Sequence, residues 1–205
     1  MFAALTLVTD AQIPNLPSQF TLLGAVSGSN WAAPGFIALY VGRTKAAYNM
    51  TFGASDMVNF ILLWYDSSAR SEWWLDSYLG QCVTDCVGNQ LCTSGGTCDD
   101  DPFEIVRDFV ANAKPHGACG QNVSGTSYRN AMDGIIVTAC VDARGTVETL
   151  TIAYEGGNAR IKVTMFRGGE PPASLLTPPA ACSTTCDDSA TTSVHAHRRS
   201  SSWWY

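Results

Sequence analysis

The segment Val147-Glu-Thr-Leu-Thr-Ile-Ala-Tyr154 is followed, after Glu155-Gly-Gly157, by Ile161-Lys-Val-Thr-Met-Phe166. In both segments apolar side chains alternate with polar or small ones, which is the period of a β-strand with one buried face. The Gly-Gly pair between them is typical of a tight turn, so the two strands form an antiparallel hairpin rather than a crossover. A third strand, Gly134–Val141, precedes them across a short turn at Gly145. This part of the chain predicts antiparallel hairpins.

Four more strands are predicted upstream, because short runs of aromatic and β-branched residues are separated by breaks that contain Gly, Asp or Ser. They are Phe36–Val41, Ala46–Phe52, Val58–Tyr65 and Glu72–Leu79. The Val58–Tyr65 run is apolar almost throughout, so we expect both of its faces to be covered. Residues 13–35, with three prolines and several Gly and Ser, predict a loop. Seven strands and one helix predict a mainly β (β-rich α+β) fold of curved antiparallel sheets, since one apolar face must pack against another.

The helix is predicted to begin within Asp101-Pro-Phe-Glu104, because Asp at the cap, Pro at the first position and Glu in the first turn are start signals. Phe103, Val106 and Val110 form an apolar stripe behind it. The carboxylates of Asp99, Asp100, Asp101 and Glu104 form a candidate calcium site of irregular kind, because calcium prefers oxygen ligands from a flexible loop. The competing interpretation is that these acids only favour the positive end of the helix.

Composition limits the class of protein. The chain has 205 residues, of which 46% are hydrophobic and 15% charged, so it can build a core in a single domain. The formal net charge of -6 argues against a nucleic-acid partner, and no run of apolar residues predicts a membrane span. We assign the domain to residues 12–182. Residues 1–11 are either a signal-peptide remnant or the product of an incomplete gene model, and residues 183–205 predict a disordered tail.

Eight cysteines indicate a disulfide framework in an oxidising compartment: Cys82, Cys86, Cys92, Cys98, Cys119, Cys140, Cys182 and Cys186. Four of them lie in residues 81–101, which predict a disulfide-held loop. Zinc is the alternative for this cluster, but no CxxC pair occurs in it. The glycosylation sequons at Asn49 and Asn122 predict exposed loops or strand edges. These features favour an extracellular protein, with the lysosomal lumen as the alternative.

A resemblance to a known family adds to this interpretation. Arg160-Ile-Lys-Val-Thr-Met-Phe-Arg-Gly-Gly-Glu-Pro-Pro-Ala-Ser-Leu-Leu-Thr-Pro-Pro-Ala-Ala-Cys182 resembles the end of ependymin-related proteins: a strand, a Gly and Pro turn, an apolar residue, a Pro-Pro pair and a cysteine. A hydrophobic strand, a second strand with an acidic residue and a cysteine follow one another in that family. Similar segments here are Phe60-Ile-Leu-Leu-Trp-Tyr-Asp66, Trp73-Trp-Leu-Asp76 and Gly80-Gln-Cys82. Val137-Thr-Ala-Cys140-Val141 resembles its later strand-borne cysteine. Order and rough spacing agree from about Ile37 to Cys182.

The resemblance implies a LolA-like fold of curved antiparallel sheets around an apolar pocket, commonly dimeric. It also implies association with calcium, lipid and cell–matrix contact. It carries over a Cys82–Cys182 bridge, and we take Cys119 as the partner of Cys140. The chain departs from the family in having no cysteine before Cys82 and an added cysteine-rich insertion at 81–101.

Apolar residues of the predicted strands are the candidate ligand pocket: Phe52, Phe60, Leu62, Trp64, Trp73, Leu75, Ile152 and Val163. Trp74 and Tyr78 belong to the same aromatic group. The alternative is that these side chains form an ordinary filled core. Curved sheets enclose small ligands when they are too wide for side chains to fill.

An enzyme is not expected, because the common nucleophile-elbow, phosphate-loop, zinc-protease and dinucleotide motifs are missing from the sequence. Three other groups of residues offer chemistry. His116 and Cys119 could pair as base and nucleophile. Asp66, Asp76 and Asp142 could supply a glycosidase pair. His195 and His197 could bind a transition metal. We therefore predict a secreted glycoprotein that binds a lipid or fatty acid, with calcium, matrix contact and a homodimer as further expectations. The alternatives are a structural or adhesion module with a filled core, or an extracellular hydrolase.

Overall fold

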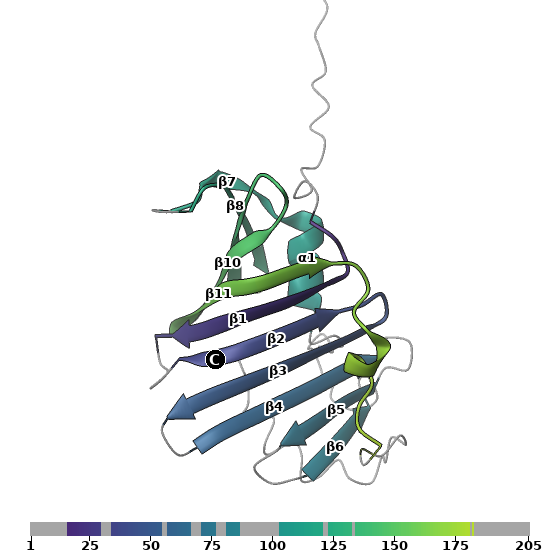
Figure 1. Ribbon diagram of the computed structural model, residues 1–205. Helices are drawn as coiled ribbons and strands as arrows, with labels where there is room; N and C mark the ends of the chain where they lie inside the picture. The colour runs from purple at the N-terminus through teal and green to yellow at the C-terminus, as the bar shows by residue number, and fades with distance from the viewer. Residues whose placement is uncertain are drawn as a thin grey trace, which may run out of the picture.

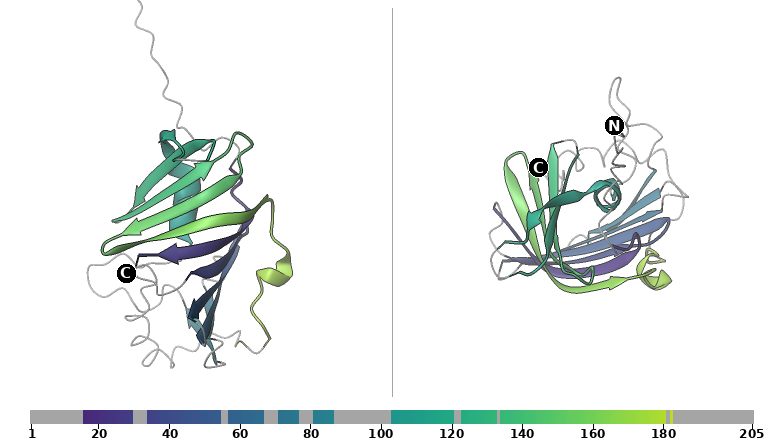
Figure 2. Two further views of the ribbon diagram at one scale, coloured as in Figure 1. Left: turned by 60° about the vertical axis from the view of Figure 1, so that its left-hand side comes forward. Right: turned by 90° about the horizontal axis from the view of Figure 1, so that it is seen from above.

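A computed structural model describes residues 16–29, 34–54, 57–66, 71–76, 81–86, 103–120, 123–132, 134–180 and 182. These residues form one antiparallel sheet of eleven strands in the order β6-β5-β4-β3-β2-β1-β11-β10-β9-β8-β7. The sheet coils around a single α-helix without closing, since β6 and β7 are its two edges (Figures 1 and 2). The mainly β fold of curved antiparallel strands with one short helix is confirmed.

The strands, in chain order, are β1 (Phe20–Gly28), β2 (Gly35–Val41), β3 (Lys45–Ala54), β4 (Met57–Asp66), β5 (Ser71–Asp76), β6 (Gln81–Cys86), β7 (Lys114–Ala118), β8 (Thr126–Met132), β9 (Ile135–Val141), β10 (Val147–Tyr154) and β11 (Gly157–Gly168). The helix α1 spans Glu104–Asn112, and a 3-10 turn η1 spans Ala173–Leu175.

The topology is two meanders that meet at β1 and β11. Strands β1 to β6 pair in sequence order, and so do β7 to β11. The β10–β11 hairpin closes at Tyr154 opposite Gly157, and the turn needs Gly156, whose φ of 88° other residues rarely adopt. The long-range β1–β11 pairing joins the two halves into one sheet. The sheet therefore depends on contacts between the first and last strands of the domain.

The main core lies on the face of the sheet that turns toward α1 (Figure 2). Alternate residues of the central strands are buried there, together with Phe103, Phe109 and Ala113 from the helix region. The ring of Phe103 lies 6.1 Å from that of Tyr48 and 6.4 Å from that of Tyr65. These contacts hold the start of α1 against β3 and β4.

The predicted start of this helix was wrong by about two residues. The helix begins at Glu104, and its N-cap is Phe103, which makes no side-chain capping hydrogen bond. The Phe103 ring is only 2% exposed, so its burial anchors this end of the helix in the core. The stripe formed by Phe103, Val106 and Val110 does face the core as predicted.

The predicted loop over residues 13–35 was wrong, because Phe20–Gly28 forms the central strand β1. Glycines hid this strand from the sequence pattern. A Cβ on Gly24 would lie 2.6 Å from Ile161 Cγ2 and 2.8 Å from the Lys162 carbonyl oxygen, where β1 and β11 change register. Glycine is there for close approach of two strands and not for a turn.

Three other strands were not predicted. Gln81–Cys86 forms β6, although residues 81–101 were predicted to be a loop. Strands β7 and β8 also lacked a prediction. All five residues of β7 are exposed at the edge of the sheet, and it contains Pro115, so it has no apolar alternation to detect. Pairing with a neighbour, and not burial, makes it a strand.

A smaller core covers the opposite face of the sheet, which we call the outer face. Here Ala47, Trp64 and Trp73 pack with Leu176 and Cys182 from the segment after β11. The indole Nε1 of Trp64 donates a hydrogen bond to the Leu175 carbonyl at 3.3 Å. A disulfide between Cys82 and Cys182 ties this segment to β6. The chain after β11 therefore runs across the outer face of β3–β6 (Figure 1).

Candidate functional site

The strongest candidate for a ligand site is the space between α1 and the centre of the sheet. A small cavity of about 40 Å³ lies there. Its lining is entirely apolar: Leu16, Phe20, Leu22, Leu39, Val106, Phe109, Val110, Val137, Ala139, Val147, Leu150, Ile152 and Phe166. The helix supplies one wall and five strands of both meanders supply the other, so the cavity exists only in the folded sheet.

Strand alternation and the helix stripe place these side chains. On β10, Leu150 and Ile152 face the cavity, whereas Thr151 between them faces the outer side. On α1, Val106, Phe109 and Val110 face the sheet. These spacings are two residues along a strand and three or four along a helix, as each geometry requires. The result is an apolar surface on both sides of the cavity.

Side-chain hydrogen bonds hold one side of the helix. The Asp108 carboxylate accepts hydrogen bonds from the side-chain amides of Asn112 on α1 and Asn130 on β8. On the other side of the helix, burial lowers the pKa of Arg107 from its ordinary value, while the nearby charge of Tyr65 acts in the opposite direction. At the start of β3, next to Tyr65, Lys45 Nζ lies 3.2 Å from the carboxylate of buried Asp66. The helix is thus held by apolar packing plus a tie to β8.

The predicted pocket residues divide between the two faces. Ile152 lines the cavity, and Val163 is half-buried against the main core. The prediction was wrong for Trp64, Trp73 and Leu75, which lie on the outer face under the segment after β11. The sequence shows that these aromatics are buried but not which chain segment covers them. For Phe52, Phe60, Leu62 and Trp74, the backbone lies in β3, β4 or β5 and the side chains lie outside the described part. Tyr78 lies outside the described residues altogether.

Several predicted sites lie outside the described residues. They are Asp99, Asp100 and Asp101 with the Glu104 side chain, His195 and His197, the sequon at Asn122, residues 1–11 and 183–205, and the part of the 81–101 loop after β6. Among the residues that the structure does describe, no group of three or more His, Cys, Asp or Glu is close enough together to hold a metal ion. Calcium binding remains a prediction.

The Cys82–Cys182 disulfide that the resemblance carries over is present, and so is the Cys119–Cys140 pair that we assigned separately. Cys82 and Cys182 are joined across 100 residues, and Cys119 and Cys140 across 21. Cys86 lies in β6, and its side chain, like Cys92, Cys98 and Cys186, is outside the described part of the chain. The second bond joins the end of β7 to β9 across the outer face of β8.

The expected exposed setting of Asn49 was wrong. Asn49 lies within β3, between β2 and β4, and is half-buried with its Oδ1 atom inaccessible to solvent.

Two of the arrangements considered for catalysis, His116 with Cys119 and the three aspartates, do not assemble among the described residues. Cys119 is oxidised, so it supplies no thiolate for exposed His116. Asp66 and Asp76 stand at opposite ends of the β4–β5 pair, five residues apart, which is about 17 Å at the rise of a strand. A glycosidase pair needs carboxyl groups within about 10 Å. Asp142 follows β9, in the other meander, where its carboxylate pairs with Arg144.

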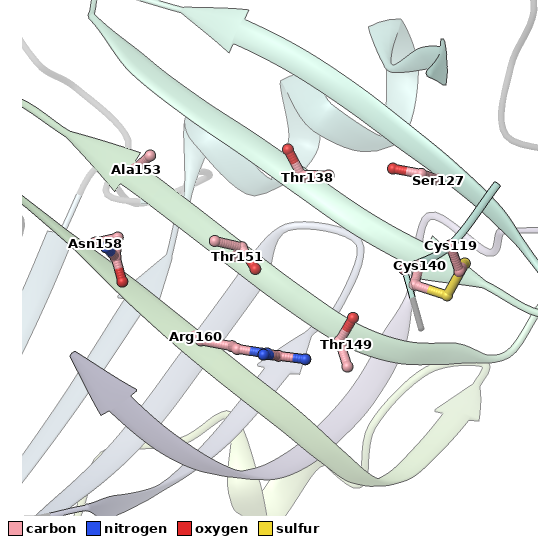
Figure 3. Close-up of a pocket in the computed structure, with 10 residues that line it drawn as sticks. Cys119, Ser127, Thr138, Cys140, Thr149, Thr151, Ala153, Asn158 and Arg160 are labelled. Carbon is pink, nitrogen blue, oxygen red and sulfur yellow. A yellow bond between two sulfur atoms is a disulfide. The ribbon is translucent and has the colours of Figure 1, made fainter. Parts of the chain in front are cut away.

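A second hollow lies on the outer face, over β8 to β11 (Figure 3). Its volume is about 470 Å³. Six of its ten lining residues have polar side chains, and they stand beside the Cys119–Cys140 disulfide: Ser127, Thr138, Thr149, Thr151, Asn158 and Arg160. The sequence did predict that Thr151 alternates with apolar residues of β10. It could not show that polar residues of four strands stand side by side, because that depends on strand register.

Comparison with known proteins adds no family assignment. No protein-family model matches the chain, and no curated protein matches it at a significant level. No helix of the described residues has the length and apolar character needed to cross a membrane. The functional interpretation therefore depends on the geometry described above.

Proposed function

We propose that this protein binds an apolar ligand, a lipid or fatty acid, between α1 and the face of the sheet that turns toward it. The observation that carries the proposal is the wholly apolar lining of the cavity at that place. Ligand sites in proteins are concave and mainly apolar, and curved sheets offer such a surface.

The ligand would enter by displacing α1 outward. The cavity of about 40 Å³ is close to the share of a single water molecule in liquid water, about 30 Å³, and a lipid chain needs far more. The helix is not part of the strand ladder, whose edges are β6 and β7, so in this proposal its movement separates no strand pair. In this proposal α1 covers the apolar face of the sheet, and a bound ligand takes the place of the helix's apolar side chains on that face. The hydrogen bond between Asp108 and Asn130 joins the helix to β8.

The setting we propose is extracellular, or the lysosomal lumen, and the protein would be of ependymin-related type. Two disulfides support an oxidising compartment. The open curved sheet over a short helix is the shape that the resemblance implies. Contact with the extracellular matrix, calcium dependence and a homodimer belong to the same proposal.

Uptake of a fluorescent fatty acid tests the ligand proposal. In Leu150→Trp an indole ring would occupy the space under α1, and uptake should fall at least about tenfold, the equivalent of roughly 1.4 kcal/mol. The matched control is Thr151→Trp, which places the same ring one residue along β10 on the outer face. Near-ultraviolet circular dichroism confirms that both variants are folded. Equal uptake by the two variants would place the ligand elsewhere.

The second candidate is an adhesion or structural module with a filled core, and the small size of the cavity favours it. Mass spectrometry of organic extracts from the purified protein separates the two functions. The apolar-ligand proposal predicts a copurifying lipid or saturable uptake of the fluorescent fatty acid. A clean extract together with no uptake would support the filled core.

A further inference from the structure

The outer face of β8–β11 carries an ordered row of polar side chains. Arg129 on β8 is opposite Thr138 on β9, Thr138 is opposite Thr151 on β10, and Thr151 is opposite Arg160 on β11. We call these four residues the threonine row. Adjacent strands lie about 4.8 Å apart, so two guanidinium groups stand at the ends of a row whose Cα atoms span about 14 Å.

Strand alternation directs this row away from α1. A sequence neighbour of each member of the row is buried in the main core: Tyr128, Val137, Ile152 and Ile161. Figure 3 shows Thr138, Thr151 and Arg160 on one side of the sheet, with the helix behind it. The row is therefore separate from the proposed lipid site, on the opposite face of the same strands.

Three of the four residues of the row, all but Arg129, line one or both of two adjoining hollows. Thr138, Thr151 and Arg160 line the hollow of about 470 Å³ described above. A neighbouring hollow of about 690 Å³ shares Thr149 and Arg160 with it and continues to Lys162 and Ser27. Arg160 thus stands between two recesses, and a chain-like ligand can run across both.

The charge of this face is the reverse of that of the whole chain. Lys114 is opposite Arg129, and Lys162 is opposite Thr149, so two more cations adjoin the row. None of the four basic side chains forms an ion pair within the part of the chain that the structure describes. Two carboxylates border the area, half-buried Glu148 in the second hollow and exposed Glu155 at the β10–β11 turn. Four cations therefore gather on one face of a chain whose net charge is -6.

The chemistry of the row fits a ligand that carries both oxyanions and hydroxyl groups. Guanidinium groups bind carboxylate and sulfate oxygens in a two-pronged manner, and threonine hydroxyls both donate and accept hydrogen bonds. No aromatic ring lines either hollow, so the stacking surface that a bare nucleobase uses is missing from these linings. We propose that the threonine row is a binding site for a sulfated glycan chain.

A fluorescent heparin-derived octasaccharide, titrated by anisotropy at two salt concentrations, tests this site on the full chain. In Arg129→Gln/Arg160→Gln the Kd should rise at least about tenfold, since each lost charge-assisted contact weakens binding severalfold. The charge-matched control is Arg43→Gln/Arg167→Gln, which removes two exposed arginines outside the row and should change the Kd less than about threefold. Higher salt should weaken binding of the wild type.

A second variant separates glycan recognition from simple charge attraction. Thr138→Val/Thr151→Val keeps every charge and removes the hydroxyl groups between them, and it should raise the Kd about threefold or more if the sugar is recognised. Desulfated octasaccharide should lose binding. The proposal is overturned if both arginine variants lose affinity equally, if the valine variant binds like wild type, or if single-stranded DNA or anionic vesicles of matched charge bind as tightly. Absence of octasaccharide binding would also overturn it. None of these outcomes affects the lipid site on the opposite face.

Discussion

The Cys82–Cys182 disulfide provides the sharpest test of how the two ends of the domain are held together. It joins β6, an edge strand, to the segment that crosses the outer face after β11. Cys182 is 3% exposed and packs with Trp64, Trp73 and Leu176. The variant Cys82→Ala/Cys182→Ala removes the bond without placing hydroxyl groups in this apolar cluster.

The magnitude follows from the length of the loop that each disulfide closes. Removing a crosslink across 100 residues costs about 4.7 kcal/mol in the loop-entropy model. The Cys119–Cys140 bond is nested inside this loop and already closes 21 residues, which lowers the figure by only about 0.2 kcal/mol. For Cys119–Cys140 itself the same relation predicts about 3.3 kcal/mol. The first variant should therefore lose more stability than Cys119→Ala/Cys140→Ala.

Two measurements check this order. Urea denaturation without reductant determines the free energy of unfolding of each variant. Tryptophan fluorescence shows whether the covering segment loosens, because Trp64 hydrogen-bonds to the Leu175 carbonyl and becomes solvated when that segment leaves. The emission should shift to longer wavelength in Cys82→Ala/Cys182→Ala only. The chain has six tryptophans, so a Trp64→Phe background assigns the shift.

A loss of less than about 1 kcal/mol in Cys82→Ala/Cys182→Ala, or a loss smaller than that of Cys119→Ala/Cys140→Ala, would contradict the loop-entropy estimate. A loss of the expected size without a fluorescence change would contradict only the prediction that the segment after β11 loosens. In that case apolar packing of Leu176 would hold the segment in place without the crosslink.

Three further substitutions follow from the fold. Gly24→Ala should destabilise the protein by about 1–3 kcal/mol in urea denaturation, because the new Cβ would lie 2.6 Å from Ile161. The control is Gly120→Ala, whose Cβ meets no atom within 4 Å and which should change stability by less than about 0.5 kcal/mol. Phe103→Ala should cost about 3–5 kcal/mol and reduce the near-ultraviolet signal, since this ring is 2% exposed against two tyrosines. Hydrogen bonds to Asp142, chiefly from the Thr146 N–H, hold the pKa of its carboxyl group below the ordinary 3.8. The stability that this group contributes is therefore present above pH 3.8 and is lost as the pH falls through the lower folded-state pKa. In Asp142→Asn the free energy of unfolding should depend less on pH in that acid range.

Each of these has an outcome that would contradict it. Equal effects of the two glycine substitutions would mean that strands β1 and β11 separate easily. A loss below about 1 kcal/mol for Phe103→Ala would mean that α1 contributes little to the core. An unchanged acid limb in Asp142→Asn would show that other carboxylates control stability at low pH.

The face taken by the aromatic strands shows the limit of inference from one sequence. The Val58–Tyr65 run was expected to be covered on both faces. In the structure Tyr65 packs in the main core and Trp64 in the smaller outer cluster. What could not be predicted was that residues after β11 supply the outer cover, since contacts between distant segments leave no local pattern. The same limit explains the wrong pocket assignment of Trp73 and Leu75.

Local patterns were sufficient for the β class, the hairpins around β10 and the apolar stripe of α1, because strand and helix periods act over a few neighbouring residues. They also indicated cysteines that could pair. Tertiary structure alone decided that β1 is a strand, since Gly24 is required only where β11 approaches it closely. It also decided that Thr138 and Thr151 stand between Arg129 and Arg160. Register across strands and the close approach of two backbones are properties of pairs of segments, so they arise only when the chain is folded.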